Sequence, residues 1–213
     1  MAEANQASAA SAVLVRRLNR ALYSLEHPIA QLPVAGYPRP GQRRQRPAAV
    51  LVALLEYPSP EVVLTVRAHH LDKHPGQIAF PGGARASDDR GVVDTALREA
   101  EEETGIDRNC FEPKGLLGRY DTITGYRMTA VVATVRGPVE FQPDRNEVDE
   151  VFTVPLNRVA DPDAYQHQQV KYQAQDYQLL TLQHPEHNIW GATAALLYQL
   201  GQRLQPDRDW REH

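Results

Sequence analysis

Residues 82–106 read GGARASDDRGVVDTALREAEEETGI, a glycine pair followed by an acidic turn and a run rich in glutamate. A helix advances about 100° per residue, so the apolar residues of the run share one face: Val93, Ala96, Leu97 and Ala100. Glu99, Glu102 and Glu103 fall together on a different face. The stretch therefore predicts a short helix whose apolar side packs into a core, and Gly105 is expected to end it in a left-handed cap.

The three glutamates on one face predict a cation site. Carboxylates this close repel one another, and like charges at i,i+4 destabilise a helix. Carboxylate oxygens suit Mg²⁺ or Mn²⁺, and Arg98 is placed one turn before Glu102 to pair with it. The alternative is a solvated acidic surface helix with a glycine stop. We disfavour it because a Phe-Pro-Gly-Gly turn and an Arg-Glu pair accompany the run.

These residues resemble the Nudix box, whose pattern is Gly, five residues, Glu, seven residues, and Arg-Glu-U-x-Glu-Glu-x-Gly-U, where U is bulky and apolar. The matching positions are Gly83, Arg98, Glu99, Glu102, Glu103, Gly105 and Ile106. Asp89 replaces the isolated Glu of the family, and eight residues rather than seven separate it from Arg98. Ala100 is also small for its position. The longer loop leaves the role of Asp89 open.

The resemblance extends upstream to the coenzyme A diphosphatase branch of the Nudix hydrolases. The matching positions are Leu64, Thr65, Arg67, Ala68, Leu71, His74, Gly76, Gln77, Ile78, Phe80, Pro81, Gly82 and Gly83. Asp72 departs, since the branch commonly has Arg there, although Lys73 follows at once. Residues 122–126 and 189–194 also look like this branch. The resemblance covers roughly residues 48–203.

The resemblance implies an α/β fold of the Nudix type, an α/β/α sandwich around a mixed β-sheet. It implies metal-dependent hydrolysis of a nucleoside diphosphate-linked substrate, namely coenzyme A or acyl-CoA, to 3′,5′-ADP and (acyl-)4′-phosphopantetheine. ADP-ribose, dinucleotides and nucleoside triphosphates stay open as substrates because of Asp72. A non-catalytic nucleotide-sensing Nudix domain is disfavoured, because such domains usually lose box carboxylates and this sequence keeps all three.

The resemblance also assigns roles within the box. A Mg²⁺ or Mn²⁺ ion is expected on Glu99, Glu103 and Glu102, with a backbone carbonyl from Gly83. Glu102, Glu99 and Arg98 form the expected catalytic set, in which Glu102 or a later acid takes the proton of the attacking water. Nudix enzymes often draw a further ligand or base from a loop after the box, and Glu147 and Glu150 are the candidates. An ordinary acidic turn is the alternative for both.

The loop before the glycine pair carries the expected substrate contacts: Arg67, Lys73, His74 and Gly82. Cations and backbone groups of this kind can bind a diphosphate. His74 is equally open to a structural hydrogen bond. Zinc is disfavoured because His69 and His70 are adjacent and no Cys or His-Glu-x-x-His pattern accompanies them, so both are interpreted as surface residues. His167, His184 and His187 are interpreted in the same way.

Hydrophobic patterns outline the rest of the chain. The predicted strands are 48–56, buried on both faces, 62–67, 115–122, 128–135 and 151–154, with one or two more in 165–184. A closing helix is predicted across 190–204, and an amphipathic helix across 14–25 after ten disordered residues. We divide the chain into an N-terminal helix with a Pro- and Arg-rich linker packed on the domain (1–46), a Nudix hydrolase domain (47–205) and a tail (206–213). The linker arginines Arg39, Arg43, Arg44 and Arg46 are expected in solvent, with a strap near the phosphates as the alternative.

Composition narrows the class of partner. The 213 residues carry a formal charge of −4 with a pI near 6.1, which argues against a nucleic-acid binder and leaves a small-molecule nucleotide substrate. One cysteine excludes a disulfide framework and suits a reducing compartment. No apolar run approaches the roughly 20 residues of a membrane helix, and no secretory leader is evident, so we expect a cytoplasmic protein without a membrane partner. A mitochondrial transit peptide is a minor alternative, and a homodimer is kept open.

Overall fold

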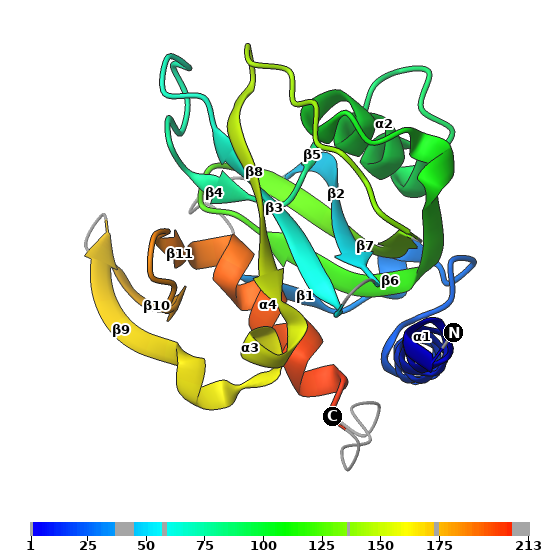
Figure 1. Ribbon diagram of the computed structural model, residues 1–213. Helices are drawn as coiled ribbons and strands as arrows, with labels where there is room; N and C mark the ends of the chain where they lie inside the picture. Colours follow the sequence, from blue (N-terminus) through cyan, green and yellow to red (C-terminus); the bar gives the residue numbers. More distant parts are fainter. Residues whose placement is uncertain (1, 37–44, 57–58, 136, 173–174, 206–213) are drawn as a thin grey trace.

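The computed structural model describes residues 2–36, 45–56, 59–135, 137–172 and 175–205 (Figure 1). The linker arginines Arg39, Arg43 and Arg44, expected in solvent or in a strap, lie outside the described residues, and so does the expected tail, 206–213. Within the described part of the chain, no helix combines the length and the apolar character needed to cross a membrane.

A mixed eight-stranded sheet forms the middle layer, as expected. Its strands are β1 (Val34–Gly36), β2 (Arg46–Leu55), β3 (Glu61–Arg67), β4 (Ile78–Ala79), β5 (Gly82–Ala84), β6 (Phe111–Asp121), β7 (Tyr126–Val135) and β8 (Val148–Pro155). The main order is β1-β6-β7-β2-β3-β4, with β5 added to β2 and β8 added to β3. The β1–β6 and β2–β7 pairs are parallel and the others are antiparallel.

The continuous apolar run of β2 is explained by burial on both faces of the sheet. Val50, Val52 and Leu54 belong to one hydrophobic cluster, whereas Ala49, Leu51 and Ala53 belong to the other. Successive side chains of a strand point to opposite faces, so a strand at the centre of a three-layer fold must be apolar throughout.

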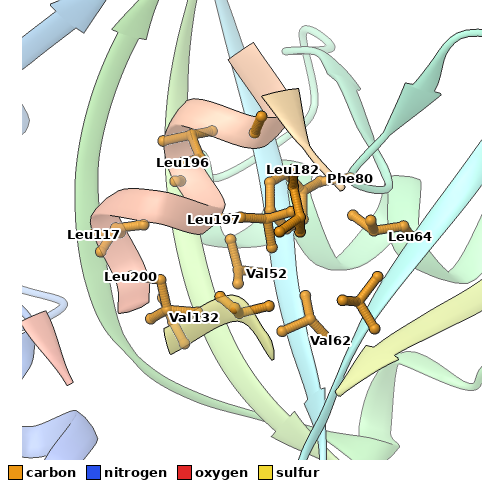
Figure 2. Close-up of a cluster of buried hydrophobic side chains, with 14 of the residues drawn as sticks. Val52, Val62, Leu64, Phe80, Leu117, Val132, Leu182, Leu196, Leu197 and Leu200 are labelled. Atoms are coloured by element: carbon orange, nitrogen blue, oxygen red, sulfur yellow. The ribbon is translucent and has the colours of Figure 1, made fainter. Parts of the chain in front are cut away.

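Helices cover both faces of the sheet (Figure 1). α2 (Val92–Thr104) packs on one face, and α4 (Gly191–Arg203) packs on the other, together with α3 (Leu156–Ala160) and α1 (Ala2–Ala21). Figure 2 shows Leu196, Leu197 and Leu200 of α4 in one cluster with Val52 and Val132 of the sheet. The structure therefore confirms a mixed α/β fold in three layers.

A second, three-stranded sheet of order β11-β10-β9 lies beside α4. It consists of β9 (Tyr165–Tyr172), β10 (Gln175–Leu182) and β11 (Ile189–Trp190). The Gln-rich stretch therefore forms two strands, one of the two outcomes expected. Short 3₁₀ helices complete the fold: η1 (Ile29–Gln31), η2 (Arg108–Cys110) and η3 (Pro162–Ala164).

Three expectations were wrong. Residues 2–10 are helical rather than disordered, since α1 begins at Ala2 in an alanine-rich segment of high helix propensity. The glycine pair is not a turn, because Gly82 and Gly83 pair with β2 as part of strand β5. His187 is not a plain surface residue: its side chain is 13% exposed, and its ring stacks on Phe152 with centroids 3.8 Å apart.

Candidate metal and substrate site

The acidic helix α2 lies against β2 and β5. Ala96 and Ala100 have no exposed surface and pack in the same cluster as Ala49 and Leu51 of β2. The helix ends at Gly105, whose φ is 75° and whose N–H donates to the carbonyl oxygen of Glu101 over 2.9 Å. The left-handed cap is therefore confirmed, and the apolar face of the helix is the one that the sequence pattern predicted.

Glu99 and Glu103 face the glycine strand. The carboxylate of Glu103, which is 4% exposed, accepts a hydrogen bond from the backbone N–H of Gly82. A Cβ atom built on Gly83 would lie 2.5 Å from the carboxylate carbon of Glu99. Only glycine at position 83 therefore leaves room for the Glu99 carboxylate where it lies. The N–H of Gly82 is directed at Glu103, and the expected contact of Gly82 with substrate stays a prediction.

The positive charge beside Glu99 and Glu103 does not offset the burial of their carboxyl groups. Burial, followed by the neighbouring charge of Glu99, raises the pKa of Glu103 to about 8, against the opposing effects of Arg67 and the Gly82 N–H. Burial also raises the pKa of Glu99, although Arg98 opposes it. Glu147 contributes repulsion to both groups. A divalent cation between these carboxylates would relieve this repulsion.

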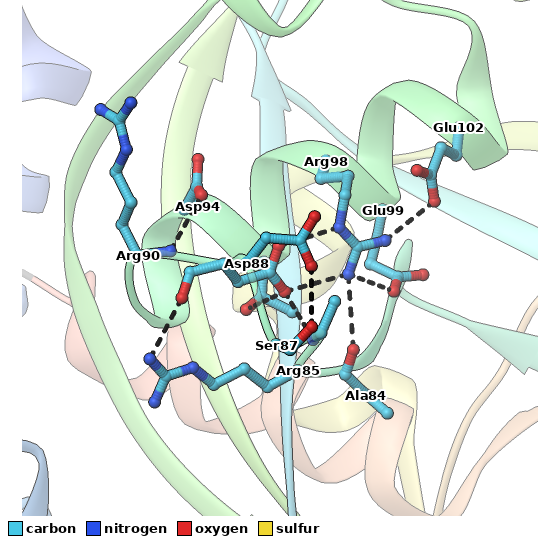
Figure 3. A network of polar contacts seen from close by, with 12 residues as sticks. Ala84, Arg85, Ser87, Asp88, Arg90, Asp94, Arg98, Glu99 and Glu102 are labelled. Atoms are coloured by element: carbon cyan, nitrogen blue, oxygen red, sulfur yellow. Dashed lines mark hydrogen bonds and ion pairs between the residues drawn. The ribbon is translucent and has the colours of Figure 1, made fainter.

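Arg98 organises the acidic groups around it (Figure 3). Its guanidinium group lies 2.9 Å from Oε1 of Glu99 and donates to Oε2 of Glu102 over 3.0 Å, so the expected Arg98–Glu102 pair is present. It also donates through Nε and Nη2 to both carboxylate oxygens of Asp89, over 3.0 and 3.1 Å. One guanidinium group thus bonds to three carboxylates.

Asp89, whose role the sequence left open, is an anchor of the loop before α2. It is 6% exposed and accepts from the backbone N–H of Ala86 and from the hydroxyl of Thr95, each over 2.8 Å. The hydrogen bonds from Arg98 hold the pKa of Asp89 well below its usual range. Although the spacing between Asp89 and Arg98 is one residue longer than in the family pattern, the loop places the Asp89 carboxylate against Arg98. The signal available in the sequence was an acid followed by Thr95 and Arg98, both on the helix face towards the loop.

Glu102 is the most exposed of the three box glutamates. Its side chain is 54% exposed and shares Arg98 with Glu99, whereas Glu99 and Glu103 are turned towards β5. As the side chains stand, no three His, Cys, Asp or Glu residues in the described ranges are arranged to hold a metal ion. Magnesium commonly takes one or two carboxylates and completes its shell with waters and substrate phosphates, so the Glu99–Glu103 pair suits it.

Arg67 and Glu147 come to this site from two other elements. Arg67 ends β3, is half-buried, and lies near enough to Glu103 to oppose the rise in its pKa. Glu147 lies beside the end of β3, because its carbonyl oxygen accepts from the N–H of Ala68 over 2.9 Å. Of the two downstream candidates, Glu147 is the one whose charge acts on Glu99 and Glu103. Oε1 of Glu150 instead lies 3.6 Å from Nε2 of His187.

Lys73 and His74 lie in the exposed loop between β3 and β4. His74 has a φ of 57°, an uncommon value outside glycine that histidine tolerates better than most residues. Among the described contacts, none joins either side chain to the acidic helix. The structure thus brings Arg67 and Gly82 to the carboxylates and leaves Lys73 and His74 in solvent.

Comparison with known proteins identifies the family of this chain. The NUDIX domain model matches residues 45–175. The Nudix hydrolase NudL of Pectobacterium atrosepticum is 36% identical over 161 residues, which cover 76% of this chain and 84% of the relative. NudL of Escherichia coli O157:H7 is 35% identical over 159 residues, which cover 75% and 83%.

A MutT/nudix family protein from Enterococcus faecalis has a similar fold. Its crystal structure aligns with a TM-score of 0.50 and 18% identity, over 79% of this chain and 65% of that one. The matched domain and the identity to NudL show the family, and the box residues on α2 fit it. The chain belongs to the NUDIX family and is a hydrolase.

Proposed function

We propose that this protein hydrolyses the diphosphate of coenzyme A or its thioesters, giving 3′,5′-ADP and 4′-phosphopantetheine or its acyl form. One observation carries the diphosphatase part of the proposal. The buried carboxyl group of Glu103 and the partly buried one of Glu99 face a glycine strand, the nearby Arg67 and Arg98 do not offset the effect of burial, and the pKa of Glu103 is raised to about 8. Such a pair is suited to a divalent cation and a phosphate substrate.

Nudix hydrolases generally use divalent metal ions. The residues that would hold Mg²⁺ or Mn²⁺ here are Glu99 and Glu103, with Glu102 beside them and a backbone carbonyl from Gly83. When bound, the cation would neutralise the diphosphate and lower the pKa of a coordinated water. Arg98 would keep Glu99 and Glu102 in place through its contacts at 2.9 and 3.0 Å.

The remaining roles fall to residues around the carboxylate pair. Glu147 acts as the general base that takes the proton of the attacking water, a role supported by its electrostatic effect on Glu99 and Glu103. Glu102 is the alternative base, since its side chain is 54% exposed although it is paired with Arg98. Arg67 binds the phosphates and stabilises the charge that develops on them.

The sequence signature across residues 64–83 supports the choice of coenzyme A. In the fold this segment forms β3, the loop with Lys73 and His74, β4 and β5, so the signature borders the acidic helix. Arg67 provides a cation at the inner end of the loop, and Lys73 provides one at its exposed part. A 3′-phosphorylated nucleotide presents several anionic groups that such a loop can contact.

Product identification tests this proposal. Purified protein is incubated with Mg²⁺ and, separately, coenzyme A, acetyl-CoA, ADP-ribose, a dinucleoside polyphosphate and a nucleoside triphosphate. We expect 3′,5′-ADP from the first two at the highest kcat/KM, and its loss in Glu103→Gln. Preferential cleavage of ADP-ribose would overturn the choice of coenzyme A while keeping the diphosphatase chemistry. Tight nucleotide binding without turnover of any substrate would overturn both.

A further inference from the structure

An irregularity in the sheet lies beside the proposed base. β3 and β8 pair in regular antiparallel register from Glu61 opposite Pro155 to Val66 opposite Glu150, and the register then shifts so that Arg67 is opposite Val148. Asp149 is therefore the extra residue of a β-bulge. A bulge leaves its extra residue out of the ladder and redirects its side chain, and bulges are over-represented next to active sites.

The bulge decides which residue lies opposite the end of β3. In unbroken register Ala68 would be opposite Val148, but here its N–H donates to the carbonyl oxygen of Glu147 over 2.9 Å. A shift of one residue exchanges the two faces of a strand. The bulge thus sets where the backbone of Glu147 lies and in which direction its side chain points. This position is next to Arg67 and the Glu99–Glu103 pair.

His69 holds the side chain of the bulged residue. The backbone N–H of His69 donates to Oδ2 of Asp149 over 3.0 Å, and Nδ1 of its ring contacts the same oxygen. These bonds lower the pKa of Asp149 from its ordinary value. The ring also packs on Gly76, where an added Cβ would lie 2.8 Å from Nε2 of His69. The loop that carries Lys73 and His74 is thus linked to the segment that carries Glu147.

We propose that His69 and Asp149 are positioning residues, which hold the bulge so that the Glu147 carboxylate points at Glu99 and Glu103. This inference rests on the function proposed above. The His69 side chain is 75% exposed and that of Asp149 is 39% exposed. Exposed ion pairs contribute little to folding stability. The effect of the link is therefore expected in turnover rather than in stability.

Substitution of Asp149 tests the inference by the split between kcat and KM. Asp149→Ala should lower kcat about tenfold, as expected when a catalytic group is displaced slightly, while KM and the melting temperature stay close to those of wild type. Asp149→Asn should restore most of the rate, because its amide oxygen still accepts from the His69 N–H. Asp163→Ala, which removes an exposed acid far along the chain, is the matched control and should behave as wild type.

A double-mutant cycle shows whether Asp149 acts through Glu147. Residues that act as one unit give non-additive effects. Asp149→Ala should therefore cause no further loss in a Glu147→Gln background. The inference is overturned if Asp149→Ala keeps the wild-type kcat, or if it lowers kcat by the same factor in both backgrounds.

Amide hydrogen exchange provides a readout that does not depend on activity. In Asp149→Ala the amide protons of Ala68 and His69 should exchange faster, with the central residues of β3 unchanged. Unchanged protection of both amides would overturn the inference whatever the activity. Faster exchange in a protein that hydrolyses no diphosphate would overturn the proposed function and support the His69–Asp149 link.

Discussion

Two neighbouring glycines of β5 serve different purposes. At Gly83 an added Cβ would meet the carboxylate of Glu99 at 2.5 Å, which is the far end of a flexible side chain. At Gly82 it would meet the backbone oxygen of Ala49 at 2.5 Å and the Cα of Val50 at 2.7 Å, which belong to a central strand. The first conflict is relieved when Glu99 moves. The second requires the sheet itself to move.

Alanine substitutions should therefore separate activity from stability. Gly83→Ala is expected to keep a melting temperature close to that of wild type and to lower kcat about a hundredfold, because it displaces a proposed metal ligand. Gly82→Ala should lower the melting temperature itself. Thermal unfolding and steady-state kinetics measure both. A fully active Gly83→Ala variant would show that the position of Glu99 is unimportant.

Glu103 should make the stability of the metal-free protein depend on pH. Its pKa in the folded protein, about 8, lies above the ordinary value of 4.5. Its contribution to stability is therefore fully present below about pH 4.5 and is lost as the pH rises through about 8. With EDTA present, the free energy of unfolding of wild type should fall relative to Glu103→Gln between about pH 4.5 and pH 8 and then level off. Parallel pH curves for the two proteins would contradict the raised pKa.

At the scale of elements, α2 depends on the loop that precedes it. Asp89 bonds to the loop through Ala86 and to the helix through Thr95 and Arg98. Because Arg98 in turn holds Glu99 and Glu102, the loop and the carboxylates form one connected network (Figure 3). Asp89, which contacts none of the proposed metal-binding residues, is thereby coupled to the site through Arg98.

Removal of the Asp89 carboxylate should affect both the fold and the rate. Asp89→Ala leaves Arg98 without its principal partner, so we expect a lower melting temperature and a kcat reduced by about ten- to a hundredfold. Asp88→Ala, at the exposed neighbouring position, is the control and should match wild type in both. Unfolding and kinetic measurements on the pair check this. Equal behaviour of the two variants would mean that Asp89 has no special role.

Most elements were predictable because local patterns specify them. The continuous apolar run of β2 indicates burial on both faces, and the 3.6-residue apolar pattern of α2 indicates burial of one face. Gly105 marks the end of that helix. The role of Asp89 was not predictable, because it depends on how an atypically long loop folds. The bulge at Asp149 depends on the register between strands that are far apart in the sequence. Burial of His187 against Phe152 likewise arises only when β8 and the segment before β11 meet.

At the scale of the molecule, elements from separate parts of the chain meet at one site. α2 supplies the glutamates, β5 the glycines, β3 Arg67, and the segment before β8 Glu147. The sequence predicted the first three through the box and the upstream signature. It could not decide between Glu147 and Glu150, since both lie in one acidic stretch and only the register of β8 separates them. Nor could it predict that Glu102 is the exposed one of the three, because that depends on how α2 packs against β5.

Cation binding at α2 is the central claim, and a titration with Mn²⁺ followed by electron paramagnetic resonance tests it most directly. Wild type and Glu101→Gln, which changes a glutamate whose Oε1 accepts from the N–H of Arg108 over 3.1 Å, should bind Mn²⁺ equally. Glu103→Gln should bind it at least about tenfold more weakly, as expected for the loss of one carboxylate ligand. Equal Mn²⁺ affinity in all three proteins would contradict the assignment of the cation to the Glu99–Glu103 pair.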